Sequence, residues 1–282
     1  MNLNPVEMSY DSWIAPIIRE EARSYMAKVI PIIREAKKRY TASSDIAFEY
    51  YPHGLSDLVS TSPRDLDELV DIGVGLRTTD KSNEIVLNLG LCNTLAHGVR
   101  SGLQVNFGRV GESWWDHNFA SFANGGIQIN YGAVGGYFGW CAEGGIQINL
   151  GKVYGIWDED RFMVSIPGMG SSSSISLNLG EVVMPSGEYK QYITPEKESK
   201  LGKIFATLLR LKEPSTSFED AVQACMCVLD YKKFESQLQD AIKEYKMSQG
   251  LGNDVYLLNF GSIFEDRTSM FASHRKNETP KP

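Results

Sequence analysis

The sequence predicts an α+β fold in which helices cover a largely antiparallel β-meander. One observation is a short pattern (apolar, any residue, apolar, Asn, apolar, Gly) that recurs through the middle of the chain. Its two-residue period is that of a half-buried strand. The other observation is helical periodicity on both sides of this region, at residues 12–40 and 195–250. Runs of strands flanked by runs of helices are typical of α+β domains.

The repeated motif is clearest in two nearly identical copies, Gly125–Gly132 and Gly144–Gly151. In a strand, Ile127 and Ile129 share one face, and Asn130 lies on the other with its neighbouring Gln. We therefore expect one buried face and one polar face, as in an antiparallel sheet. The closing Gly permits a turn or a bulge. Looser copies of the motif begin at four further positions: Ile85, Leu103, Ile175 and Leu257.

Two architectures fit the spacing of the motif. The first is a meander of about 8–10 strands in which every second strand contains the motif. Its return strands would lie near Leu95–Arg100, Ser113–Phe122 and Val134–Trp140. The alternative is a parallel β-solenoid core with one motif per rung. The motif asparagines are separated by unequal steps of 18, 24, 19 and 29 residues, which favours the meander: Asn88, Asn106, Asn130, Asn149 and Asn178.

The chain is expected to form one domain over residues 1–264, followed by a disordered polar tail at 265–282. The domain comprises a long N-terminal helix, a β-rich core, a segment with two helices and a returning strand, at residues 12–40, 44–190, 195–250 and 255–261 respectively. Pro31 is expected to kink or break the first helix, because it removes a backbone donor and clashes with the preceding turn. The copy of the motif in the returning strand suggests that the last strand rejoins the sheet.

Composition excludes several classes of function. The net charge of −7 and a pI near 5.2 argue against general nucleic-acid binding, which needs clustered positive charge. No apolar run reaches the roughly 18 residues that span a bilayer. No secretory signal opens the chain, and its four cysteines form no C-x-x-C pair, so we expect reduced thiols and a cytoplasmic protein. The sequence has no phosphate-binding loop and no histidine pair with ligand spacing, so it predicts no cofactor and no metal site.

One set of residues has the composition of a cysteine-dependent active site. Cys141 is a candidate nucleophile, His117 a candidate base, and Asp116 or Glu143 a candidate orienting acid. A meander could bring the two segments onto neighbouring strands. Cysteine nucleophiles usually lie at a helix N-terminus, however, and the sequence after Cys141 predicts a strand. A hydrolase or transferase therefore remains the alternative function.

The favoured function is a non-enzymatic protein-interaction module. Trp and Tyr are enriched in binding hot spots, and they cluster in the central β region. Such a module could be an inhibitor or effector that binds a host protein, or an oligomeric structural subunit. Sheet edges need cover, so we also expect a homo-oligomer. The candidate binding residues combine aromatic side chains with two motif asparagines: Trp114, Trp115, Tyr137, Trp140, Asn130 and Asn149.

Overall fold

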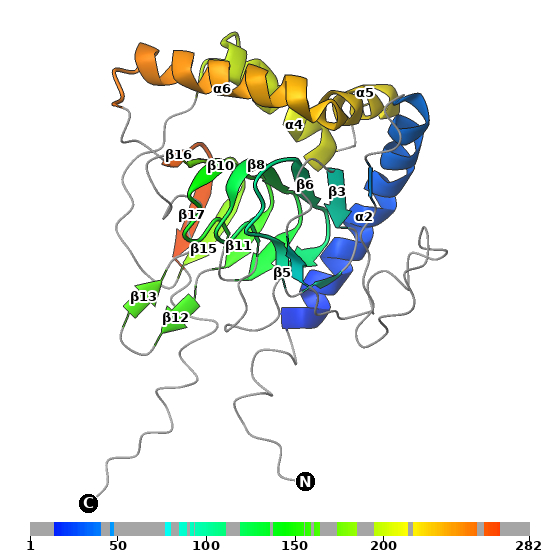
Figure 1. Cartoon of the computed structure of the whole chain (residues 1–282). Helices are drawn as coiled ribbons and strands as arrows, with labels where there is room; N and C mark the ends of the chain where they lie inside the picture. The colour runs from blue at the N-terminus through cyan, green and yellow to red at the C-terminus, as the bar shows by residue number, and fades with distance from the viewer. Residues whose placement is uncertain are drawn as a thin grey trace, which may run out of the picture.

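The fold is α/β, and the described residues include four helices packed against a mostly parallel sheet (Figure 1). The computed structural model describes residues 14–40, 46–47, 77–79, 85–88, 91–92, 94–110, 119–135, 138–154, 156–158, 161–163, 174–184, 195–213, 217–252 and 257–265. Two expected features lie outside this described part of the chain. They are the capped helix start at residues 62–69 and the tail that follows residue 265.

The larger sheet has seven strands, and every pair of neighbours in it is parallel. Its spatial order is β1 (Ile46–Ala47), β3 (Ile85–Asn88), β6 (Leu103–Asn106), β8 (Asn124–Asn130), β10 (Gly144–Asn149), β14 (Ile175–Asn178) and β16 (Leu257–Asn259). Strand order therefore follows chain order. Each copy of the motif lies beside the next, in a register that pairs Asn130 with Asn149 and Asn149 with Asn178.

A second parallel sheet has six strands. Its order is β17 (Ser262–Glu265), β15 (Glu181–Met184), β11 (Lys152–Tyr154), β9 (Ala133–Gly135), β7 (Arg109–Val110) and β4 (Leu91–Cys92). Each of these six strands is separated from the preceding motif strand by two residues, as β9 is from β8. Two short pairs complete the described strands. They are the parallel pair β2 (Arg77–Thr79) with β5 (Thr94–His97) and the antiparallel pair β12 (Ile156–Asp158) with β13 (Arg161–Met163).

The predicted antiparallel meander is wrong. Successive motif strands pair directly and in parallel, so no return strand lies between them. The segment Val134–Trp140, expected as a return strand, instead contributes to the second parallel sheet and then to a bend. Parallel neighbours require the chain to cross back between strands, and the segment Val134–Trp140 is part of that crossing between β8 and β10. The β-solenoid alternative is not supported either, because the motif strands are one layer of an α/β fold whose apolar face is buried by helices.

Both faces of the motif strands are buried, which corrects the expectation of a polar exposed face. The apolar side chains, such as Ile127 and Ile129, pack against the helices. The asparagines on the opposite face form a ladder in which each Nδ2 donates to the Oδ1 of the next at 2.7–2.9 Å. A second row links Gln104, Gln128 and Gln147 at 2.9 Å. Because these amides satisfy one another, the polar face can be buried without unpaired groups.

A small apolar cluster lies on the same side of the motif strands as the asparagine ladder. It contains one Val from each of β7, β9 and β11, namely Val110, Val134 and Val153, all with no measurable exposure. Phe119 and Phe138 stack in the same cluster with ring centroids 4.9 Å apart. The interior therefore combines amide rows on the seven-stranded sheet with apolar side chains from the second sheet.

The outer apolar face is covered by helices α2 (Ile14–Arg39), α4 (Lys200–Lys212), α5 (Phe218–Leu229) and α6 (Tyr231–Ser248) (Figure 1). The predicted first helix is confirmed, and it continues through Pro31 without a break. Ser199 and Ser217 cap α4 and α5 by accepting the backbone N–H groups of Gly202 and Asp220. The segment contains three helices rather than the predicted two, because the chain leaves helical geometry at Asp230.

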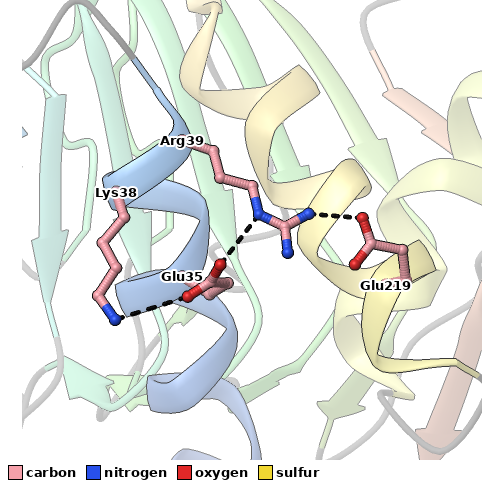
Figure 2. Close-up of polar contacts among 4 residues, drawn as sticks. All are labelled: Glu35, Lys38, Arg39 and Glu219. Atoms are coloured by element: carbon pink, nitrogen blue, oxygen red, sulfur yellow. Dashed lines mark hydrogen bonds and ion pairs between the residues drawn. The ribbon is translucent and has the colours of Figure 1, made fainter.

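Helix α2 is tied to α5 by an ion cluster at the surface (Figure 2). Arg39 donates to Glu35 one turn earlier (Nε to Oε1, 3.0 Å) and to Glu219 of α5, and Lys38 lies 3.6 Å from the second oxygen of Glu35. The hydrogen bond from Arg39 lowers the pKa of Glu35. Exposed ion pairs contribute little stability, so burial of the apolar face, rather than this cluster, holds α2 against α5.

Two tyrosines attach the second half of α4 to helix α2 and to the sheet. Tyr25 of α2 donates its hydroxyl to the Leu211 carbonyl (2.9 Å), and Tyr131 donates to the Leu208 carbonyl (3.2 Å). Leu211 is one of the last four residues of α4, whose carbonyls lack intrahelical donors, so the Tyr25 hydroxyl satisfies a group that the helix itself leaves unpaired. Burial raises the pKa of both tyrosines well above 10.0. It also raises the pKa of the neighbouring Cys225 from 9.0 to about 12.

We expect stability to fall as the pH rises from about 9 to about 12, because these three groups stay protonated in the folded state and ionise in the unfolded state. Their stabilisation is complete below pH 9. Each group then adds a slope of up to about 1.4 kcal/mol per pH unit above its unfolded pKa. Urea midpoints measured between pH 8 and 11 would show the decline. Cys225→Ala removes one ionising group, so it should reduce the slope of the unfolding free energy against pH by up to about 1.4 kcal/mol per pH unit. An unchanged slope in Cys225→Ala would contradict the assignment.

Candidate functional site

Three bends at one side of the sheets are stacked on one another. Leu95 and Phe119 form an isolated parallel bridge, as do Phe119 and Phe138. Backbone hydrogen bonds continue the stacking, from Gly98 N to Ser121 O (2.9 Å) and from Phe122 N to Trp140 O (2.8 Å). Residues that follow these bridges at equal distances along the chain therefore occupy equivalent places in successive bends.

Each bend contains left-handed backbone at two equivalent places. The first is occupied by Ala96, Ala120 and Gly139, with φ values of +58°, +59° and +70°. The second is occupied by Gly98, Phe122 and Cys141, with φ values of +68°, +56° and +51°. Left-handed geometry costs a non-glycine residue about 1–2 kcal/mol, so the surrounding hydrogen bonds must hold these bends in place. The side chains that the bends present are consequently well fixed.

The bends place three ring side chains in a row, which we name the aromatic edge: His97, Phe122 and Trp140. The ring centroids of His97 and Phe122 lie 5.3 Å apart, and those of Phe122 and Trp140 lie 5.0 Å apart, both in edge-on geometry. All three residues are half-buried. A row of partly exposed rings that are fixed by their neighbours can bind a partner with little loss of conformational entropy.

Polar side chains border the aromatic edge two or three residues further along the bends. The equivalent residues Arg100, Asn124 and Glu143 are all exposed. They present a cation, an amide and a carboxylate in successive bends. An apolar centre with a polar border of mixed charge is the usual composition of a protein-binding surface.

The predicted binding residues are separated by the structure. Trp140 belongs to the aromatic edge, while Trp114, Trp115 and Tyr137 lie outside the described residues. Asn130 and Asn149 have no exposed surface, because they are central members of the asparagine ladder. Their inclusion in a binding surface was therefore wrong, and their role is to hold strands together.

His97 and Phe122 are site residues that the sequence analysis missed. A signal was available upstream of the two best copies of the motif. Phe119 and Phe138 each stand six residues before the first Gly of a copy, so the repeat extends back through both bends. Aligning the longer repeat would have shown that Phe122 and Trp140 lie in neighbouring bends.

The surroundings of Cys141 are not those of an activated nucleophile. The thiol is half-buried, and both desolvation and the Glu143 carboxylate raise its pKa. A nucleophilic cysteine needs the opposite, a depressed pKa beside a cation or a helix N-terminus. Cys141 is instead followed by strand β10. The proposed base His117 and acid Asp116 lie outside the described residues.

We expect Cys141 to be alkylated slowly by iodoacetamide at pH 7, since little of it is thiolate, and faster as the pH rises above 9.0. Exposed Cys227 in the same chain is the internal reference and should react first, whereas buried Cys225 should react only on unfolding. Peptide mapping by mass spectrometry would follow the three sites separately. Alkylation of Cys141 that is faster than that of Cys227 at pH 7 would contradict this expectation.

Two other kinds of feature are absent from the described part of the chain. Among the residues that the structure describes, no group of three His, Cys, Asp or Glu side chains could hold a metal ion. Within the same residues, no helix is both long and apolar enough to pass through a bilayer.

Comparison of the chain with protein-family models, with curated proteins and with solved structures found no match.

Proposed function

We propose that the protein is a non-enzymatic interaction module that binds a protein partner through the aromatic edge. The observation that supports this most is the row of half-buried rings in three stacked bends, His97, Phe122 and Trp140, bordered by exposed polar residues. Trp is enriched among the residues that dominate binding energy, and Phe is enriched at protein interfaces. A cytoplasmic inhibitor or effector of a host protein, or a subunit of an oligomeric structure, would use such a surface.

The stacked backbone supports this assignment further. The bends are held by hydrogen bonds between neighbours and by the buried Phe119–Phe138 stack beneath them. A surface that is ordered before binding loses less entropy when it binds. A cysteine-dependent hydrolase or transferase is not proposed, because the raised pKa of Cys141 weighs against it.

The test is quantitative affinity capture from the native cell with Trp140→Ala as the variant. Recovery of a specific partner should fall at least about tenfold, as for a hot-spot residue. Phe218→Ala is the matched control, because Phe218 is an exposed aromatic residue on α5 with 51% of its surface accessible. Thermal melts would confirm that both variants fold. Equal recovery of every captured protein by Trp140→Ala would refute the proposed surface.

Self-association belongs to the same proposal, because exposed sheet edges favour pairing between copies. Sedimentation velocity at micromolar concentrations should show a homo-oligomer. Trp140→Ala would then distinguish assembly through the aromatic edge from assembly elsewhere. A single monomeric species over the whole concentration range would refute the oligomer.

A further inference from the structure

The two parallel sheets end together at β16 and β17, at the opposite end from β1 and β4 (Figure 1). Each of these strands has a paired neighbour on one side only among the described residues. Strand β16 contains the last copy of the motif, in which Asn259 pairs with Asn178. Gly261 closes this copy, and β17 comes directly after it. This end is therefore a site where a further copy of the motif could be added in the same register.

The asparagine ladder has a direction, and its free donor lies at this end. Along the ladder every Nδ2 donates toward the C-terminal edge, as from Asn149 to Asn178 (2.8 Å) and from Asn178 to Asn259 (2.7 Å). The Oδ1 of Asn259 already accepts from Asn178 and from the Gly261 N–H (3.3 Å). Its Nδ2 has no acceptor in the described part of the chain and is accessible to solvent at the edge of the sheet. The end of the ladder therefore offers an amide donor that can exchange a bond to water for an acceptor on an added strand.

The backbone at this edge also offers a group that a further strand could bind. In the interior of the sheet, the carbonyl of a ladder asparagine accepts two successive N–H groups from the next strand. Asn106 O, for example, accepts from Tyr131 N (2.8 Å) and Gly132 N (3.1 Å). Asn259 presents the equivalent carbonyl at the edge. An incoming strand that runs parallel to β16 would therefore find an amide donor and a carbonyl acceptor at fixed positions.

The close approach of neighbouring strands at the last glycine of the motif requires glycine in the added strand as well. A Cβ on Gly151 would lie 1.9 Å from Gly132 O, and one on Gly261 would lie 2.1 Å from Gly180 O. Neighbouring strands thus approach too closely at this place for any side chain. The next strand after β16 needs glycine for the same reason, two residues after its ladder asparagine.

We propose that the β16 edge binds an extended segment of another protein, parallel to β16, with the sequence apolar, Asn, apolar, Gly. The Asn Oδ1 of the segment accepts the Asn259 amide, and its glycine lies against Gly261. A second copy of this chain fits less well. Its strands β3 to β14 are paired on both sides, and its other edge strand, β1 (Ile46–Ala47), contains no asparagine to accept the Asn259 amide. Two β16 edges would each offer a donor amide whose Oδ1 is already occupied. This surface is separate from the aromatic edge and goes beyond the function proposed for it.

The probe is a fluorescein-labelled peptide with the sequence of residues 145–152, Gly-Ile-Gln-Ile-Asn-Leu-Gly-Lys. Fluorescence anisotropy of this peptide titrated with the full-length chain should show saturable binding. Peptides with N149L or G151V should bind at least about tenfold more weakly, because they lack the acceptor or the close approach. Absent binding of the parent peptide, or equal binding of all three, would overturn the proposal.

Asn259→Asp tests the protein side of the contact. It removes the Nδ2 donor but keeps an oxygen for Asn178 and Gly261, and we expect at least about tenfold weaker binding. Gln237→Glu on the exposed face of α6 makes the same chemical change elsewhere and should bind normally. Equal binding by Asn259→Asp and wild type would overturn the proposal. If Asn259→Asp fails to fold, the three peptides still decide the question.

Two further outcomes separate this site from other occupants. Trp140→Ala should retain peptide binding, so failure of the aromatic edge and failure of this site are distinguishable. Sedimentation of wild type and Asn259→Asp tests for a second copy at the edge. An oligomer that Asn259→Asp dissociates, together with no peptide binding, would assign the edge to self-association and overturn the proposal.

Discussion

Gly151→Ala is expected to destabilise the protein by more than about 4 kcal/mol or to prevent folding. The added Cβ would lie 1.9 Å from Gly132 O and 2.5 Å from Tyr131 O. Both atoms belong to backbone in the neighbouring turn, so no side-chain rotation can make room. The strands β8 and β10 would have to separate where their ladders are most regular. Urea unfolding followed by circular dichroism would measure the loss.

Gly250→Ala is the matched control for this substitution. Gly250 follows α6 with φ of +64°, and nothing lies within 4 Å of an added Cβ. Its cost is therefore that of left-handed backbone alone, about 1–2 kcal/mol. Similar losses in the two variants would show that close approach of the strands is not what requires glycine at the end of the motif.

Asn130→Leu is expected to cost about 2–4 kcal/mol, although it places an apolar residue in a buried position. Asn130 accepts from Asn106 (2.9 Å) and donates to Asn149 (2.8 Å) and to Lys152 O (3.2 Å). Its removal leaves buried donors and acceptors on both sides with fewer partners. The penalty of unpaired buried amides exceeds the gain from burying a leucine side chain.

Asn124→Leu provides the comparison for the ladder. Asn124 begins the same strand but is exposed, and its amide donates only to Phe122 O (3.2 Å). We expect a change of less than about 1 kcal/mol, since exposed groups can bond to water. If Asn130→Leu were as stable as wild type, the ladder would be a consequence of the packing rather than a contributor to stability.

Gly151 and Asn130 also matter for the proposed function, because they maintain the regular spacing of the strands. Paired strands lie about 4.8 Å apart, so side chains in successive turns fall close to that separation. The rings of the aromatic edge have centroids 5.0 and 5.3 Å apart, and the Phe119–Phe138 stack beneath them has 4.9 Å. Glycines and amides that hold neighbouring turns together therefore also set the geometry of the candidate binding surface.

Part of the candidate site was accessible to sequence reasoning. Trp140 was selected because aromatic residues cluster in the β region, and it lies in the aromatic edge. His97 and Phe122 come from other bends, and only the parallel bridges align them with Trp140. Asn130 and Asn149 were selected because the polar face of the motif was expected to face solvent, and the second sheet buries that face.

The local features of the fold could be predicted from the residue pattern alone. The two-residue period identified the motif strands and their apolar face, and helical periodicity located α2 and the helical segment at 195–250. Only the tertiary structure decided the direction of pairing, because alternating side chains look the same in parallel and antiparallel strands. The tertiary structure also showed that the motif asparagines are buried. A polar residue can be buried when its neighbours satisfy it, and the neighbours of Asn130 are Asn106 and Asn149, each about twenty residues away in the chain.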